Sequence, residues 1–340
     1  GPVNRFDTEK YAGPYAAAIQ ALDSVPGPDR IFRLADMLTR QIGEMDPGTW
    51  LITASTKGGI DGLGKEDTGP ESLPFSLSLA GLADYLKKET GLVHAMNISA
   101  ACASSTIAVI KGAGLIESGA AESVLVCCLD TVSEFVFSGF SSIGAMSPEP
   151  ARPFDAGRTG LSLGEGAAAV LLMSEDRAKR LGKKVSGRIS GWGITSDAVH
   201  LTAPDREGRG LKLAVRQACK KAGVSPSDIF TINTHGTATI HNDAMEIRVI
   251  RDLFDMEKTA ANSIKGAVGH TLGAAGGIEI ALCTRMLENR IMPGTPGLGR
   301  PEEDAEPFII KNARPMNGDL ILSTNSGFGG INAAVILKGE

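Results

Sequence analysis

Apolar, strand-like runs alternate with helical stretches along most of this 340-residue chain, and this alternation constrains its fold more than any other feature. Buried strands are predicted at 50–55, 93–98, 123–129, 167–173, 185–192, 229–233, 320–324 and 332–337. Helical periodicity marks 15–22, 30–42, 76–89, 104–117, 210–222, 242–254 and 272–288. Such alternation predicts mostly parallel sheets covered by helices.

The strands and helices fall into two sets of similar size, which predicts two similar α/β halves packed together. A charged stretch ending at Lys183 and Lys184 lies between them. We therefore expect an amino-terminal half over residues 1–182 and a carboxyl-terminal half over 183–340.

Composition excludes several classes of function. The net charge of -5 leaves no basic excess for binding nucleic acid, and no apolar run is long enough to cross a membrane. The five cysteines are scattered, odd in number and form no CxxC pair, so neither a disulfide framework nor a zinc site is expected. A cytoplasmic setting without a bound metal fits this cysteine usage.

Cys102 is the sharpest candidate for chemistry. It lies between a predicted strand and the first turn of a predicted helix, where unpaired backbone N–H groups favour thiolate over thiol. Small neighbours would let a substrate carbonyl approach the sulfur. The alternative is a small core residue, and we accept that alternative for Cys127, Cys128, Cys219 and Cys283.

Two histidines have a sequence context typical of a site. His235 follows the predicted strand 229–233 directly, where α/β proteins place functional groups, and His270 precedes a helix start rich in glycine and alanine. A capping or core role is the alternative for His270. Three other histidines lack such a context and are expected to be surface or structural residues: His94, His200 and His241.

Two glycine-rich segments need separate interpretations. The segment 273–277 lacks the Lys-Ser/Thr pair of a phosphate-binding loop, so close helix packing explains it better. The segment 325–330 sets Phe328 among glycines after a strand, which would free a backbone N–H beside a mobile aromatic ring; a turn beside a core phenylalanine is the alternative.

Together these segments resemble the elongating β-ketoacyl-acyl carrier protein synthases of the thiolase superfamily. The resemblance runs from about Trp50 to the end and keeps the order and spacing of several motifs. These are Ala-Cys-Ala-Ser-Ser at 101–105, Arg-Pro-Phe-Asp at 152–155, Gly-Glu-Gly-Ala at 164–167, Thr-His-Gly-Thr at 234–237, Ser-Ile-Lys at 263–265, Gly-His at 269–270 and Gly-Phe-Gly-Gly at 327–330.

The resemblance implies an acyltransferase that condenses an acyl group on Cys102 with a malonyl unit as carbon dioxide leaves, giving a 3-oxoacyl thioester in fatty acid or polyketide synthesis. The backbone N–H groups of Cys102 and Phe328 would form an oxyanion hole, with Phe328 also a gate. His235 and His270 would donate hydrogen bonds to the malonyl thioester oxygen. Lys265 would orient the site.

The same resemblance implies a supporting role for Glu246, paired with Lys265, and contacts from Thr237 and Thr239 to a phosphopantetheine arm. That arm would be delivered on an acyl carrier protein, the expected partner, and no tightly bound cofactor is expected. The implied fold is the five-layered αβαβα thiolase fold. The implied assembly is a homodimer, with a heterodimer as the alternative.

The chain departs from the family pattern in three places. Nothing before Trp50 matches the family's apolar opening strand, the loop 325–327 is one residue shorter than usual, and Thr159 and Leu161 replace a common Asp and Phe. These departures bear on acyl-pocket shape, gating and carrier choice.

Three alternatives remain beside this interpretation. A thiolase needs a second reactive cysteine near the carboxyl terminus, where this chain has Phe328. A Cys-His hydrolase needs an Asn or Asp to orient one histidine and has no use for two histidines with Lys265. A non-catalytic, chain-length-determining partner subunit typically loses the nucleophile, whereas Cys102 is present.

Overall fold

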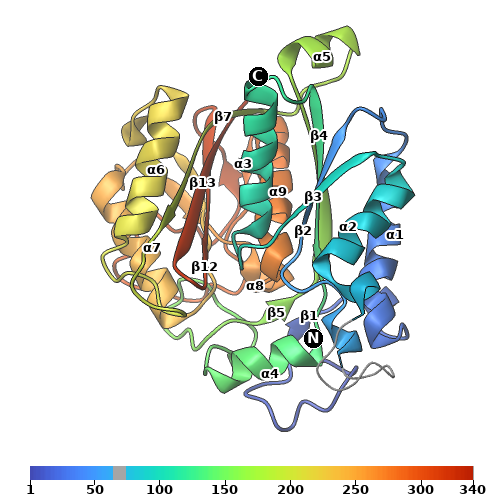
Figure 1. Cartoon of the computed structure of the whole chain (residues 1–340). Coiled ribbons are helices and arrows are strands. Elements are labelled where there is room, and N and C mark those ends of the chain that lie inside the picture. The colour runs from blue at the N-terminus through green and yellow to red at the C-terminus, as the bar shows by residue number, and fades with distance from the viewer. Residues whose placement is uncertain (64–73, 340) are drawn as a thin grey trace.

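The computed structural model describes residues 1–63 and 74–339, in which helices cover both faces of two central sheets (Figure 1). The first sheet has the strand order β3-β2-β4-β6, and the second has the order β7-β13-β12-β8-β9. The first is built from β2 (Trp50–Ala54), β3 (His94–Ile98), β4 (Ser123–Asp130) and β6 (Gly166–Met173). The second is built from β7 (Arg188–Ser196), β8 (Thr231–Asn233), β9 (Ala260–Asn262), β12 (Leu320–Gly327) and β13 (Ile331–Lys338).

Three layers of helices enclose these sheets. The middle layer is α3 (Ser104–Glu117) and α9 (Ala275–Asn289), which contact strands of both sheets. The outer layers are α1 (Arg30–Ile42) with α2 (Leu79–Thr90), and α6 (Arg209–Ala222) with α7 (Ile240–Leu253) (Figure 1). The predicted five-layered αβαβα thiolase fold is confirmed.

Short elements complete the described chain. The short helices are α4 (Glu134–Ser142), α5 (Glu175–Arg180) and α8 (Lys265–Val268). The short strands pair as β1 (Ala16–Ala17) with β5 (Leu163–Gly164) and β10 (Ile291–Met292) with β11 (Arg314–Pro315). Single 3-10 turns lie at Gln20–Leu22, Gly27–Asp29, Ile60–Gly62, Phe75–Leu77, Pro226–Asp228 and Leu272–Ala274.

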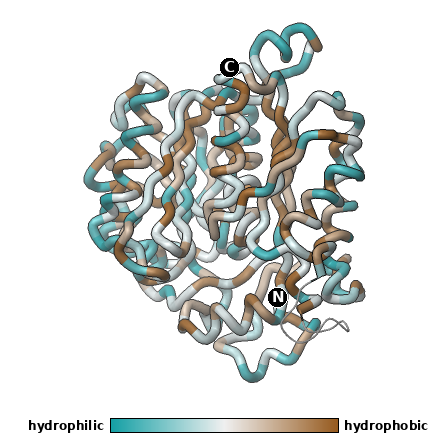
Figure 2. Tube along the Cα trace, in the orientation of Figure 1, coloured by the Kyte–Doolittle hydropathy of each residue, from teal (hydrophilic) through white to brown (hydrophobic). Residues whose placement is uncertain are grey.

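Burial of apolar side chains between the layers explains why these segments fold as they do. The sheets and the middle helices carry most of the hydrophobic residues, whereas the outer helices expose hydrophilic ones (Figure 2). The central cluster includes Val109 of α3, Val126 of β4, Ile280 of α9 and Val335 of β13, all fully buried. Each such side chain contributes roughly 1.5–3 kcal/mol relative to exposure. The helix α3 is apolar on most sides because both of its faces are covered.

Four of the seven strand pairs that the described residues form in the two sheets are parallel, in line with the prediction, whereas β4–β6, β12–β13 and β13–β7 pair antiparallel. Two other segments differ from the sequence expectations. Residues 15–22 form β1 and a 3-10 turn instead of a helix, pairing with β5 rather than burying a helical face. The strand β9 was not predicted, since Ala-Ala-Asn has no strand propensity and is strand only through pairing with β8.

The two sheets repeat one pattern with a single difference. In each, three parallel strands are followed by an antiparallel one, β6 in the first sheet and β13 in the second. The outer edge of β13 pairs with β7, whereas the outer edge of β6 has no strand partner among the described residues. All strands of the first sheet precede those of the second; the boundary between residues 182 and 183 stays a prediction.

The glycine-rich start of α9 serves close packing, as predicted. A Cβ on Gly277 would overlap the sulfur of Cys128 in β4, and the Gly277 N–H donates to Ser105 Oγ of α3 at 2.8 Å. Only a hydrogen atom fits between the middle helix and the first sheet at this point. This contact places the following turn of α9, which carries Glu279, beneath the loops that follow β3, β8, β9 and β12.

Candidate active site

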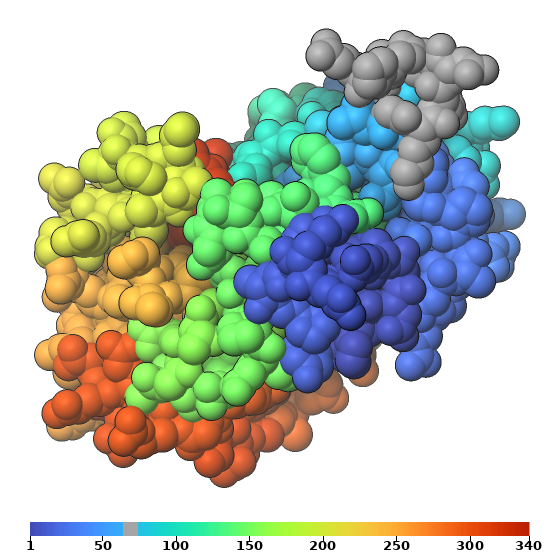
Figure 3. Space-filling model, turned by 90° about the horizontal axis from the view of Figure 1, so that it is seen from below, coloured from blue at the N-terminus to red at the C-terminus, as the bar shows by residue number. Residues whose placement is uncertain are grey.

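The loops that follow β3, β8, β9 and β12 meet near the lower end of the molecule in Figure 1. Seen from that end, residues from the middle of the chain, drawn green, lie between the amino-terminal and carboxyl-terminal parts (Figure 3). A cavity of about 300 Å³ opens here, lined by Cys102, His235 and His270 among others. The structure therefore brings together the three side chains on which the sequence interpretation depends.

Cys102 lies in a tight turn between β3 and α3. Ala101 has a left-handed backbone with φ 47°, which a small side chain tolerates best. Ser104 holds this turn, because its hydroxyl accepts from the Ala100 N–H at 2.8 Å and donates to the Ala101 carbonyl at 2.6 Å. The local sequence Ala-Cys-Ala-Ser thus presents the sulfur at the start of a helix.

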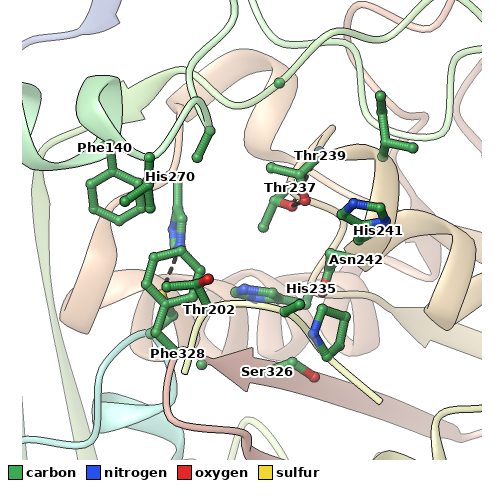
Figure 4. A pocket seen from close by; sticks show the side chains of 18 of the residues that line it. Phe140, Thr202, His235, Thr237, Thr239, His241, Asn242, His270, Ser326 and Phe328 are labelled. Carbon is green, nitrogen blue, oxygen red and sulfur yellow. Dashed lines mark hydrogen bonds between the residues drawn. The ribbon is translucent and has the colours of Figure 1, made fainter. Parts of the chain in front are cut away.

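The sulfur of Cys102 is buried among hydrogen-bond donors. His270 Nε2 lies 2.9 Å from Sγ (dashed line in Figure 4). Burial raises the pKa of Cys102 to about 11, although the charge of Lys265 and the backbone N–H groups of Phe328 and Cys102 oppose that rise. The backbone N–H groups do favour the thiolate, but desolvation outweighs them and the nearby positive charge in the free protein. The same two N–H groups lie within hydrogen-bonding reach of the sulfur.

The two histidine rings meet edge to face, with centroids 5.2 Å apart. Glu246 of α7 holds the loop of His235 by accepting from the N–H groups of His235 and Gly236 at 2.7 and 2.6 Å. His270 is fixed through its backbone N–H, which donates to the backbone carbonyl of Ser162 at 2.7 Å. Backbone contacts therefore position both rings before any substrate arrives.

Lys265 is buried, and its partner differs from the predicted one. Its Nζ forms an ion pair with Glu279 of α9 and donates to the carbonyl of His235. The predicted pairing with Glu246 is wrong, because the carboxylate of Glu246 is taken up by the His235 loop. Glu279 was missed, although an acidic residue within the otherwise apolar segment of α9 was a usable signal.

Burial keeps both imidazoles neutral. It lowers the pKa of His235 and of His270 well below 6.5, and the charge of Lys265 lowers both further. Burial also raises the pKa of Glu246 to about 7, helped by Asp243. At neutral pH the site thus contains two uncharged imidazoles, which suit hydrogen-bond donation rather than ion pairing.

We expect His235 to make the protein less stable as the pH falls below about 6.5. Its folded pKa lies below that of the unfolded chain, so the unfolded state binds more protons in this window. The stabilisation is complete above about pH 6.5 and is lost toward the folded pKa, by up to about 1.4 kcal/mol per pH unit.

Denaturant unfolding at pH 7 and pH 5.5 measures this effect in the protein and in His235→Gln. The variant should lose less unfolding free energy over the interval. Raised carboxyl pKa values, such as that of Glu246, act in the opposite direction but are common to both proteins. Equal losses in the two proteins would contradict the expectation.

The mouth of the cavity carries the remaining predicted residues. Thr237 and Thr239 face each other with hydroxyl oxygens 2.9 Å apart, and Phe328 stacks on Phe140 of α4 with centroids 5.5 Å apart (Figure 4). His241, expected to be a surface or structural residue, is exposed and also lines this cavity. Phe140 was missed because α4 was not predicted.

The Cys102, His235 and His270 ligand atoms lie within 4.8 Å of one another, a spacing that a metal ion could use. The Leu272 N–H lies 3.4 Å from Nδ1 of His270, which leaves the ring proton on Nε2, facing the sulfur. A protonated Nε2 is a donor and not a metal ligand. The expectation that no metal is bound stays a prediction.

Comparisons with known proteins identify relatives of this chain. The β-ketoacyl synthase N-terminal domain model matches residues 79–178 and the C-terminal domain model matches 186–298. A 3-oxoacyl-[acyl-carrier-protein] synthase 2 of Rhizobium meliloti (strain 1021) is 31% identical over 313 residues, covering 85% of this chain and 74% of the relative. Another of that name, from Coxiella burnetii (strain RSA 493 / Nine Mile phase I), is 29% identical and covers 99% and 90%.

A solved structure described as the ishigamide ketosynthase/chain length factor has a TM-score of 0.87 and 26% identity, covering 100% of this chain and 91% of that chain. In the part of this chain that the structure describes, no helix combines the length and apolar character needed to cross a bilayer.

Proposed function

The chain belongs to the β-ketoacyl synthase family, and from that premise we propose that it condenses an acyl group held on Cys102 with a malonyl unit on an acyl carrier protein. The product is a 3-oxoacyl-acyl carrier protein. One observation carries the proposal: the sulfur of Cys102 lies 2.9 Å from His270 Nε2, and His235 packs against that ring. The relatives' printed names describe synthases of this product class.

In the first step the Cys102 sulfur attacks the carbonyl of an acyl thioester. The N–H groups of Cys102 and Phe328 stabilise the oxyanion that forms. The carbon–sulfur bond to the carrier then breaks, and the thiol proton leaves with the departing thiolate. The raised pKa of Cys102 keeps the resting sulfur protonated until a thioester is bound.

In the second step the malonyl thioester loses carbon dioxide. The electron pair of the breaking carbon–carbon bond moves into an enolate, whose oxygen accepts hydrogen bonds from His235 and His270. Neutral donors suit this role, and burial keeps both rings neutral. The enolate carbon attacks the acyl-enzyme carbonyl, and Cys102 leaves as a thiolate that takes up a proton.

Lys265, Glu279 and Glu246 support these steps without touching the reacting atoms. Lys265 fixes the His235 carbonyl, and Glu246 fixes the adjacent N–H groups. The hydrogen bonds to the carbonyl and to the N–H groups thus fix the position of the His235 imidazole. This position matters because a small displacement of a donor weakens its contact with an enolate oxygen.

We propose that the phosphopantetheine arm of the carrier enters past Thr237 and Thr239, with Phe328 as the gate. Both hydroxyls line the cavity, and Phe328 is partly exposed above it. No tightly bound cofactor is then needed. A homodimer is the proposed assembly, with a heterodimer as the alternative, and the five free cysteines favour a cytoplasmic setting.

Sequential incubation tests the function. Acyl carrier proteins with different acyl chains are offered first, and the intact protein mass is measured; one acyl adduct per chain is expected. Malonyl-acyl carrier protein is then added, and the adduct should disappear as a 3-oxoacyl carrier appears. Loss of the adduct to free acid, with no 3-oxoacyl product from any carrier, would overturn the proposal.

A further inference from the structure

Asn325, at the end of β12, connects three elements beneath the site. Its side chain is fully buried, and the sequence interpretation gave it no role of its own. Nδ2 lies 3.2 Å from Nδ1 of His235 and 2.7 Å from Oε2 of Glu279. On the other side, Oδ1 accepts a hydrogen bond from the hydroxyl of Thr106 in α3.

These contacts allow one orientation of the amide. The carboxylate of Glu279 is paired with the Lys265 ammonium and offers only acceptors, so the amide nitrogen of Asn325 must face it. The Thr106 hydroxyl can donate to the remaining amide oxygen. One hydrogen of Nδ2 points to Glu279, and the other is left for Nδ1 of His235.

An amide hydrogen directed at Nδ1 requires a lone pair there. A neutral imidazole with its lone pair on Nδ1 carries its proton on Nε2. Because burial keeps His235 neutral, its ring carries one N–H proton, and Asn325 determines which of the two ring nitrogens holds that proton. A ring with the opposite tautomer would offer Nε2 as an acceptor and could not stabilise an enolate oxygen.

We propose that Asn325 is a positioning residue that sets the tautomer of His235, held in its own orientation by Glu279 and Thr106. The catalytic consequence rests on the proposed function, whereas the tautomer does not. Acyl loading of Cys102 does not depend on the contact between Asn325 and His235, because His270 is the ring beside the sulfur. Asn325 should therefore act on decarboxylation and not on acyl transfer.

Two-bond nitrogen–proton correlation spectra read the tautomer directly in protein labelled at its five histidines. The spectrum of His235→Gln identifies the His235 signals by their absence. We expect Nε2–H for His235 in the unaltered protein, and a shift toward Nδ1–H in Asn325→Ala while His270 is unchanged. Nδ1–H in the unaltered protein, or no change in the variant, would overturn the proposal.

Kinetics provide the second readout. Asn325→Ala should load acyl groups within about twofold of the unaltered protein but release carbon dioxide roughly 10–100-fold more slowly. An equal loss in both steps would reduce Asn325 to a structural residue and overturn its proposed role. Thr106→Val, which keeps the shape of the side chain and removes the hydroxyl, should shift the tautomer in the same direction.

The two proposals can fail separately. If Asn325→Ala does not fold, the spectrum of the unaltered protein still decides the tautomer. If no carrier loads Cys102, the proposed function fails while the spectra remain interpretable.

Discussion

Cys102→Ala should abolish the acyl adduct and lower condensation by at least about 10⁴-fold. The variant removes the sulfur that lies beside His270 and the Phe328 N–H, which is the proposed acceptor of the acyl chain. Alanine is smaller than cysteine, and the fold should survive the change. Intact-protein mass after incubation with acyl carrier protein measures the adduct, and far-ultraviolet circular dichroism checks the fold.

Cys219→Ala is the matched control for this experiment. Cys219 is a buried thiol on α6, in a hydrophobic cluster away from the site, and burial raises its pKa to about 11. The two cysteines thus have similarly raised pKa values but different surroundings. Cys219→Ala should load normally; an adduct of equal stoichiometry on Cys102→Ala would refute the nucleophile.

His235→Ala and His270→Ala should each slow decarboxylation by about 10²–10³-fold, the usual effect of removing one donor to a developing oxyanion. The two variants should differ in the first step. His270 lies 2.9 Å from the Cys102 sulfur, so its removal should also slow acyl loading, whereas His235→Ala should load nearly as fast as the unaltered protein. Release of label from the free carboxyl group of malonyl carrier protein measures decarboxylation, and adduct mass measures loading.

His94→Ala is the control, because His94 stacks on Trp50 at the edge of the first sheet and lies outside the cavity. Its carbon dioxide release should equal that of the unaltered protein. Unchanged release in both His235→Ala and His270→Ala would remove them from the mechanism.

Much of the fold follows from local patterns. The expected helix 104–117 matches α3 at both ends, and the strand 123–129 extends by one residue into β4. These segments are recognisable because their apolar residues recur with the period of the element that buries them. Segments that owe their conformation to a neighbour were missed or misassigned, as with β9 and residues 15–22.

The site residues likewise divide into those that the local sequence marks and those that it does not. Cys102, His235 and His270 stand out because each follows a strand or precedes a helix in a distinctive local sequence. Asn325 does not, since its partners lie far away in the chain, and Glu279 is marked only by being an acidic residue in an apolar segment. Lys265 was predicted as a site residue, but Glu246 was the wrong partner for it. Glu246 and Glu279 are both buried carboxylates, and only their positions in space decide which of them pairs with Lys265.

The sequence by itself determined the two-part α/β architecture and the chemical groups at three loop positions, because periodicity and motif spacing are properties of neighbouring residues. The tertiary structure decided how those groups are held. It placed Asn325 between His235 and Glu279 and the Phe328 N–H beside Cys102, and burial there raised the pKa of Cys102 and lowered those of both histidines. Desolvation and hydrogen-bond direction depend on the surroundings in space, which no local pattern records.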